Sequence, residues 1–403
     1  MKRRLLASLL SAFLCSSAVY ASDAQMVSGL DRFSEFNDES QSHIDYQVFS
    51  DLLHDMVLNV PPMDREPERM RTINTGTRAS TANESRYRHE GNRVVYHLLS
   101  DEYKEAITLY REDLEALPNQ INFSSLSSNE QLAYWFNLHN VAVIEQVMLG
   151  YPVTRINRLD AYGTNTPFLD AKILTVAGVS LSLNDIRLRI VYEQWDDPRV
   201  IYGFFNGAVG GPEIQRNAYD GNRVWGQLDR NANEFINSLR GVEVARSELR
   251  VSHIYGEASH FFPDFDTDLR AHLSSFANEE TSRQLVDGRS VRTSINDWHV
   301  ADLINGSTRC TGTAGASQML STAPENAGVA SRQGNVSTRL SCAQMPTNGL
   351  VMMNAVFERR IELLREGRFG EVYTRDIPTD ENGNELRLRP AGQPAVDTDD
   401  SDE

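Results

Sequence analysis

The clearest place for chemistry is a glycine-rich stretch, YGFFNGAVGGPEI, which runs from Tyr202 to Ile214. Backbone N–H groups in such a turn can hold an anion, or the oxyanion that forms during acyl transfer. The ligand-binding residues in this interpretation are Asn206, Gly207, Gly210 and Gly211. The stretch contains no Ser, Thr or Cys that could act as a nucleophile. A glycine turn that serves only backbone geometry is therefore the alternative.

A second set of polar residues lies on one predicted helix. Asn137 and Asn140 are one turn apart, His139 lies between them, and Glu130 lies in the first turn. These side chains could position a ligand or a water molecule beside Asn206. The alternative is that the two amides satisfy buried backbone groups where the helix packs against its neighbours.

A third pattern has the spacing of a metal site. The segment HIYGEASH places His253, Glu257 and His260 at positions i, i+4 and i+7. On a helix these would share one face, as two imidazoles and a carboxylate do around zinc. Gly256 weakens a helix there. These three residues are therefore an alternative to the expectation that the chain binds no cofactor.

The elements that must position these groups begin with helices. The segment SSNEQLAYWFNLHNVAVIEQVMLGYP predicts a long buried helix with Ser128 as N-cap, Gln131 at the capping-box position and an end at Gly150. An earlier helix is predicted to stop at Pro118. Before it, residues from His43 space apolar side chains along one helical face, and a polar insert follows. These apolar residues are Val48, Leu52, Leu53 and Val57.

The remaining elements include strands. KILTVAGVSLSLNDI predicts a hairpin that turns at Ala177 and Gly178, with Ser182 capping a short helix through Asp185. Residues 199–209, RVIYGFFNGAV, predict a strand buried on both faces. A further helix is predicted for the segment WGQLDRNANEFINSLRG. The predicted fold class is α+β: a helix-rich single domain around a small mixed sheet, with a disulfide-closed C-terminal extension.

The first 21 residues predict a secretory signal peptide. Lys2, Arg3 and Arg4 precede an apolar run, and Val19 and Ala21 are the small residues of a cleavage site after Ala21. Loss of three basic residues and no acidic one takes the net charge of the 403-residue chain from −17 to −20. Such a charge disfavours nucleic acid and anionic lipid as partners. No later segment approaches the roughly 20 apolar residues of a membrane span.

Two cysteines remain after such a cleavage, Cys310 and Cys342. In an exported chain an even number of cysteines predicts a disulfide between them. The loop that it closes is rich in Gly, Ser, Thr and Ala. Beyond it, LVMMNAVFERRIELLREG predicts one more amphipathic helix, and the acidic end DTDDSDE predicts a disordered tail.

Five segments, in order, resemble one known family. They are NEQLAYWFNLHN, VAGVSLSLNDI, DDPRVIYGFFNGAVGGPEI, QLDRNANEFINSLRGV and NDWHVAD. They are similar to the motifs of the domain of unknown function 547, which occurs in exported bacterial proteins and in plant proteins. The likeness covers roughly residues 90–303. It divides the chain into a signal peptide (1–21), a helical and linker region (22–89), the family-like core (90–303), a C-terminal extension (304–375) and an acidic tail (376–403).

The sequence departs from the family at its cysteine loop. The family pattern implies a thiol delivered to a glycine turn, as in a cysteine hydrolase. Here Asn206 stands at the first cysteine and Gly211 at the second, while Arg187 and Leu188 replace the acid and imidazole of the family's I-E-H. An amide cannot attack a carbonyl as a thiolate does.

We therefore expect an exported soluble protein, periplasmic or extracellular, that acts as a non-catalytic binding or scaffold module. Its partner would be a small molecule, a cell-envelope component or another protein. The alternative is a hydrolase or transferase with a rebuilt centre around His139, Asp185, Asn206 and the 206–212 loop.

Overall fold

The computed structural model describes residues 29–60, 65, 85–88, 90–245, 248–286, 288–303 and 306. The expected signal peptide, most of the polar insert, Cys310, Cys342, the C-terminal helix and the acidic tail lie outside these residues. The α-helices are α2 (Gln47–Met56), α3 (Asp101–Gln120), α4 (Ser128–Leu149), α5 (Tyr192–Gln194), α6 (Val224–Ile236), α7 (His253–Glu257), α8 (Phe265–Phe276) and α9 (Glu279–Val286). Among the described residues no helix combines the length and apolar character that crossing a bilayer requires.

Strands contribute three small sheets to the described part of the chain. They are β1 (Val57–Leu58), β2 (Arg93–Val94), β3 (Leu174–Val176), β4 (Val179–Leu181), β5 (Val242–Ala245), β6 (Glu248–Ser252) and β7 (Ser290–Ile295). The sheet β5-β6-β7 is mixed: β5 pairs antiparallel with β6, and β6 pairs parallel with β7. The α+β prediction is confirmed.

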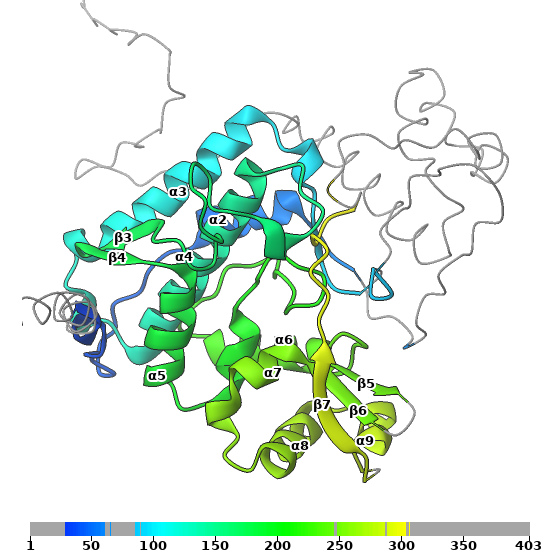
Figure 1. Ribbon diagram of the computed structural model, residues 1–403. Coiled ribbons are helices and arrows are strands. Elements are labelled where there is room, and N and C mark those ends of the chain that lie inside the picture. Colours follow the sequence, from blue (N-terminus) through cyan, green and yellow to red (C-terminus); the bar gives the residue numbers. More distant parts are fainter. Residues whose placement is uncertain are drawn as a thin grey trace, which may run out of the picture.

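Short turns of other helix types connect these elements. They are η1 (Asp31–Phe33), η2 (Tyr96–Leu98), η3 (Phe123–Ser125), η4 (Ile156–Arg158), η5 (Asp185–Val191, a π-helix), η6 (Pro198–Gly203) and η7 (Ser259–Phe261). In Figure 1 the sheet β5-β6-β7 lies with α8 and α9 in the lower right, while α2, α3 and α4 occupy the other half. The chain that follows β7 runs back into that half.

Helix α4 is the centre of the core. Every residue from Glu130 to Met148 is buried, so no side of this helix faces water. The N-terminal segment belongs to the same core, because the ring of Phe33 packs edge-on against Trp135 with centroids 5.0 Å apart. Phe49 and Leu53 of α2 join it, whereas Val48 is exposed, so only part of the predicted apolar face is buried.

The start of α4 differs from the prediction by one residue. The N-cap is Ser127, whose Oγ accepts the N–H of Glu130 at 3.2 Å. Ser128 is the first residue of the helix, and its N–H and its hydroxyl both donate to Asp38 Oδ1, at 2.8 and 2.6 Å. A carboxylate from 90 residues away thus accepts a backbone N–H at the start of α4.

Helix α3 does not stop at Pro118 as predicted; it continues to Gln120. Proline lacks the N–H that would bond the carbonyl of Leu114, four residues earlier. In the structure the Oη of Tyr134 on α4 donates to that carbonyl at 2.9 Å. The lost helical bond is thus replaced from the neighbouring helix.

The predicted hairpin is confirmed. Strands β3 and β4 pair through Val176 and Val179, and the turn residues Ala177 and Gly178 have φ values of 48° and 79°. Positive φ at both positions is what a tight two-residue hairpin turn requires. Ser182 then caps the short helical turn at residues 183–184 that leads into η5, since its Oγ accepts the N–H of Asp185 at 3.0 Å.

Candidate functional site

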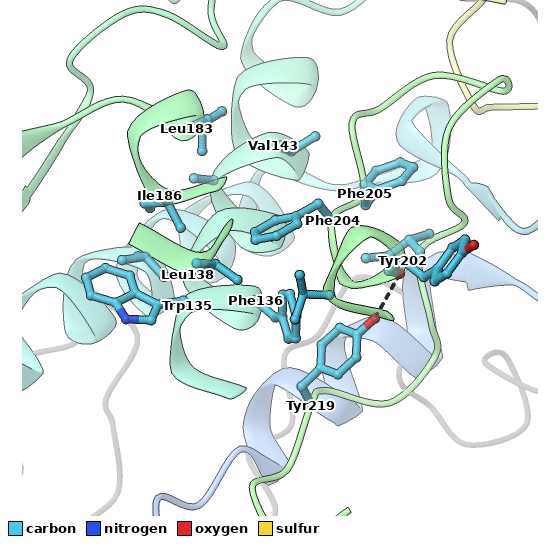
Figure 2. Close-up of a cluster of buried hydrophobic side chains, with 14 of the residues drawn as sticks. Trp135, Phe136, Leu138, Val143, Leu183, Ile186, Tyr202, Phe204, Phe205 and Tyr219 are labelled. Carbon is cyan, nitrogen blue, oxygen red and sulfur yellow. Dashed lines mark hydrogen bonds between the residues drawn. The ribbon is translucent and has the colours of Figure 1, made fainter. Parts of the chain in front are cut away.

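Residues 199–209 form no strand, so that prediction is wrong. Pro198 to Gly203 form the turn η6, capped by Asp197, whose side chain accepts the N–H of Arg199. The apolar run is continuous because it packs against α4: the ring of Phe204 lies 4.9 Å from that of Phe136. Figure 2 shows the side chains of Tyr202, Phe204 and Phe205 among those of α4 and Tyr219. A short apolar run indicates burial and does not by itself indicate a strand.

The two amides on α4 hold backbone groups of neighbouring segments. Asn140 donates to the carbonyl of Gly203 at 3.0 Å and accepts the N–H of Phe205 at 3.0 Å. Asn137 does the same to Tyr219, donating to its carbonyl at 2.8 Å and accepting its N–H at 2.9 Å. Both amides are buried. Each therefore uses its donor and its acceptor inside the protein.

The N–H groups of the glycine loop are also bonded internally. The N–H of Ala208 donates to Asn206 Oδ1 at 3.0 Å. The N–H groups of the next three residues donate to backbone carbonyls at 2.8, 2.9 and 3.3 Å. Those donors are Val209, Gly210 and Gly211, and their acceptors are His299, Asp297 and Ala208. An anion nest needs N–H groups that point into an open concavity, and these four consecutive groups already have partners.

The glycines of the loop permit close backbone approach. Gly207 has a φ of 80°, which side chains disfavour. A Cβ at Gly210 would lie 2.6 Å from the carbonyl oxygen of Asp297, and one at Gly211 would lie 2.2 Å from Asn206 Oδ1. The glycine loop thus packs closely against the side-chain amide of Asn206 and against the segment after β7.

His139 and Asp185 have separate surroundings. His139 is 1% exposed, its Nδ1 lies 3.2 Å from Asn140 Oδ1, and its ring packs edge-on against Phe204. Burial lowers the pKa of His139 to about 3, so the ring is neutral at pH 7. Asp185 instead accepts from Lys172 and from the N–H and hydroxyl of Ser182. Burial raises the pKa of Asp185, but these bonds outweigh it and hold the pKa below its usual value.

Sequence reasoning missed a buried Ser, Asp and His beside the loop. His299 Nδ1 lies 2.7 Å from Asp297 Oδ1, and Ser85 donates its hydroxyl to Asp297 Oδ2. Burial raises the pKa of Asp297, but the bonds from His299 and Ser85 hold it below the usual value. An ionised carboxylate that orients an imidazole is the arrangement of a general base. Asp297 and His299 both lie in the segment NDWHVAD, whereas Ser85 lies 212 residues before Asp297 in the sequence.

A buried charge network that was also missed follows the loop. Arg240 is 1% exposed, forms an ion pair with Glu234, and lies 3.9 Å from a carboxylate oxygen of Glu213. Burial first, and the charge of Glu234 second, raise the pKa of Glu213 to about 8 against the opposing Arg240. Glu90 accepts the N–H of Arg240 at 3.1 Å. A carboxyl group with such a pKa keeps its proton near neutral pH.

The three spaced metal-ligand candidates have partners of other kinds. His253 lies in α7 with its ring 4.8 Å from that of Trp298. Glu257, at the end of α7, forms an ion pair with Arg187 at 2.5 Å. His260 lies beyond α7, in η7, and its ring packs against that of Phe261 at 3.9 Å. Within the described ranges, the group of three whose ligand atoms lie within 4.8 Å of one another is a different one: His43, Glu130 and Asp220.

Comparison with known proteins supports the resemblance drawn from the sequence. The family described as "Protein of unknown function, DUF547" matches residues 123–236, which include α4, the β3-β4 hairpin, the glycine loop and α6. The chain is similar to this family over those residues. No curated protein and no solved structure matches the chain.

Proposed function

We propose that this chain is a non-catalytic binding or scaffold module, exported after cleavage near Ala21 and closed in its C-terminal extension by a Cys310–Cys342 disulfide. One observation carries the non-catalytic part: the N–H groups of residues 208–211 all donate within the protein. In this proposal the glycine loop has a structural role and holds α4 and the segment after β7 together. Its partner is a cell-envelope component, a protein or a small molecule.

The chemistry of position 206 supports the same proposal. An amide at this position cannot act as a nucleophile, and Asn206 Oδ1 accepts the N–H of Ala208. Asn140 and Asn137 similarly hold backbone on either side of the loop. The polar groups at the centre thus have a structural use that requires no substrate.

A thermal-shift comparison tests this function. Wild type and Asn206→Cys are melted with panels of cell-wall fragments, peptides and polysaccharides. A ligand that binds the folded state raises the melting temperature of wild type by mass action. Turnover of any panel compound that disappears in Asn206→Ala or His139→Phe contradicts the proposal.

Export has its own test. The protein is recovered from the periplasm and the medium, and its N-terminus and thiol content are determined. An N-terminus at Ser22 and no free thiol support the export proposal. An intact N-terminus, or two free thiols in native protein, contradicts it.

A second function is favoured by Asp297 and His299. Their 2.7 Å contact fixes the imidazole as in a hydrolase base. Hydrolysis of ester or amide substrates that is lost in His299→Gln, with a normal melting temperature, would support this hydrolase in place of the scaffold.

A further inference from the structure

The beginning of α4 gathers three metal-binding side chains from distant parts of the sequence. His43 comes from the segment before α2, Glu130 from the first turn of α4, and Asp220 from the loop before α6. Their ligand atoms lie within 4.8 Å of one another, and His43 Nδ1 is 2.9 Å from Glu130 Oε1. Three separate segments therefore present one nitrogen and two carboxylate oxygens to the same point.

These donors suit a divalent transition ion. Zinc binds imidazole nitrogen and carboxylate oxygen at roughly 2.0–2.2 Å, so its ligand atoms stand about 3.3 Å apart in a tetrahedral site. The contact between His43 and Glu130 is slightly shorter than this, and the 4.8 Å limit of the group is longer. Small side-chain adjustments are enough to enclose an ion. One imidazole with two carboxylates suits zinc better than it suits calcium, which takes six to eight oxygens.

Glu130 points to a cation for a second, separate reason. Its side chain is only 5% exposed, and a buried carboxylate needs a positive partner. Among the ion pairs of the described residues, Glu130 pairs with His43 alone. Its other oxygen accepts a long bond, 3.3 Å, from the N–H of Ile44. Without an ion, the hydrogen bond to Glu130 raises the pKa of His43, so the imidazole proton is the positive partner that a divalent ion would replace.

The backbone next to Asp220 allows this loop to lie close to Glu130. A Cβ at Gly221 would lie 2.3 Å from Glu130 Oε1, so glycine allows the loop to press against the carboxylate. The N–H of Asp220 donates to Gln227 Oε1 at 2.9 Å, and Asn137 holds both backbone groups of Tyr219. Fixed outer partners of this kind orient metal ligands.

One side of the group faces water. The His43 side chain is 46% exposed, which leaves a path for an ion and room for a water ligand. Arg223, whose side chain is 71% exposed, donates to Asp220 Oδ2 at 2.8 Å. The other oxygen of Asp220 accepts the N–H of Asn222 at 2.9 Å. Arg223 therefore competes with an incoming ion for one carboxylate oxygen.

We propose that His43, Glu130 and Asp220 bind a divalent transition ion, zinc by preference, which joins the N-terminal segment to α4 and to the loop before α6. The exposed side of the ion keeps water. The site is separate from the glycine loop.

Cobalt and zinc titrations of the full chain test the proposal. Cobalt(II) in a site of mixed nitrogen and oxygen ligands absorbs visible light, and zinc displaces it. The variants are His43→Ala, which removes an exposed ligand, and Arg223→Ala, which removes the competing cation. Asp38→Asn is the matched control, because this exposed carboxylate bonds Ser128 at the same helix end without belonging to the group. Melting curves without metal show that each variant folds.

We expect a cobalt spectrum and tight zinc binding in wild type and in Asp38→Asn. His43→Ala should weaken zinc binding by about tenfold to a hundredfold, and Arg223→Ala should tighten it. Equal zinc affinity in wild type and folded His43→Ala overturns the proposal. So does a cobalt spectrum that depends on His260 instead, because the ion would then bind the α7 region.

Discussion

Two parts of the same helix use their polar side chains in opposite ways. In the middle of α4, Asn137 and Asn140 direct both ends of their amides to backbone groups, and His139 is buried beside them. At its beginning, Glu130 meets His43 and Asp220 on a side that faces water. The residue types alone favour a site in both places. What separates structural polar groups from ligands is whether their bonds are already satisfied inside the protein.

The largest expected effect is at Asn140. Asn140→Leu leaves the carbonyl of Gly203 and the N–H of Phe205 buried without a partner. We expect the free energy of unfolding to fall by about 2–5 kcal/mol, measured by urea denaturation. Asn119→Leu on exposed α3 surface is the control and should change it little. If Asn140→Leu lowers the free energy of unfolding no more than Asn119→Leu does, the amides in the middle of α4 are not structural groups and the comparison fails.

The next largest change in the free energy of unfolding is expected at Gly210, where glycine allows close packing. In Gly210→Ala the new Cβ meets the carbonyl of Asp297, and the free energy of unfolding should fall by about 1–3 kcal/mol. Gly226→Ala, within α6 and with nothing within 4 Å of its Cβ, should instead raise it by about 0.5–1 kcal/mol. Equal effects of the two substitutions in thermal melts would mean that the glycine loop accommodates the new Cβ with little loss of stability.

Acid sensitivity tests the burial of His139. Its folded pKa of about 3 lies below the unfolded value of 6.5. The unfolded chain therefore binds the extra proton, so this contribution to stability is full above pH 6.5 and is lost as the pH falls towards 3. The change is on the order of 1 kcal/mol per pH unit. His139→Phe keeps an aromatic ring and should reduce the loss of stability between pH 6 and pH 4.

Asn119→Leu on the exposed surface of α3 provides the control for that measurement, since it removes no ionisable group and should leave the slope unchanged. The expected signature is a difference in slope between the two variants. Parallel stability curves for wild type and His139→Phe would show that the ring gains a proton without cost, which contradicts its burial.

The smallest expected effect is at the contact that replaces a helical bond. Tyr134→Phe leaves the Leu114 carbonyl without the donor that Pro118 cannot supply. We expect a loss of about 1 kcal/mol in the free energy of unfolding. Tyr162→Phe, 69% exposed, is the control. A neutral Tyr134→Phe would show that the end of α3 does not need this bond.

Local patterns predicted much of the fold. The hairpin, α4, α6 and the cap at Ser182 follow from turn residues, spacing and capping, which act over a few positions. The errors come from contacts across the chain. Asp38 accepts the N–H of Ser128, which the sequence assigned as the N-cap of α4. Tyr134 donates to the carbonyl that Pro118 leaves unbonded in α3, and packing on α4 makes the run at 199–209 continuously apolar.

The site was predicted less well for the same reason. The loop residues and α4 amides were identified, but their bonds cross long stretches of the chain. Two N–H groups of the loop bond the carbonyls of His299 and Asp297, about 90 residues later. The α4 amides bond backbone groups of Gly203, Phe205 and Tyr219. His43 and Glu130 are 87 residues apart, and neither Asp220 nor His43 stands in a motif with ligand spacing. A single sequence contains no local signal for such a group.

Hydrogen exchange of the loop amides tests the central claim most directly. The peptide spanning residues 204–214 is followed by mass spectrometry, alone and with phosphate, acetate and the ligand panel. We predict slow exchange that no anion changes, because the N–H groups of residues 208–211 donate within the protein. Fast exchange in the free protein, slowed by an anion or a panel ligand, would show that the loop is an open binding site and would contradict the account.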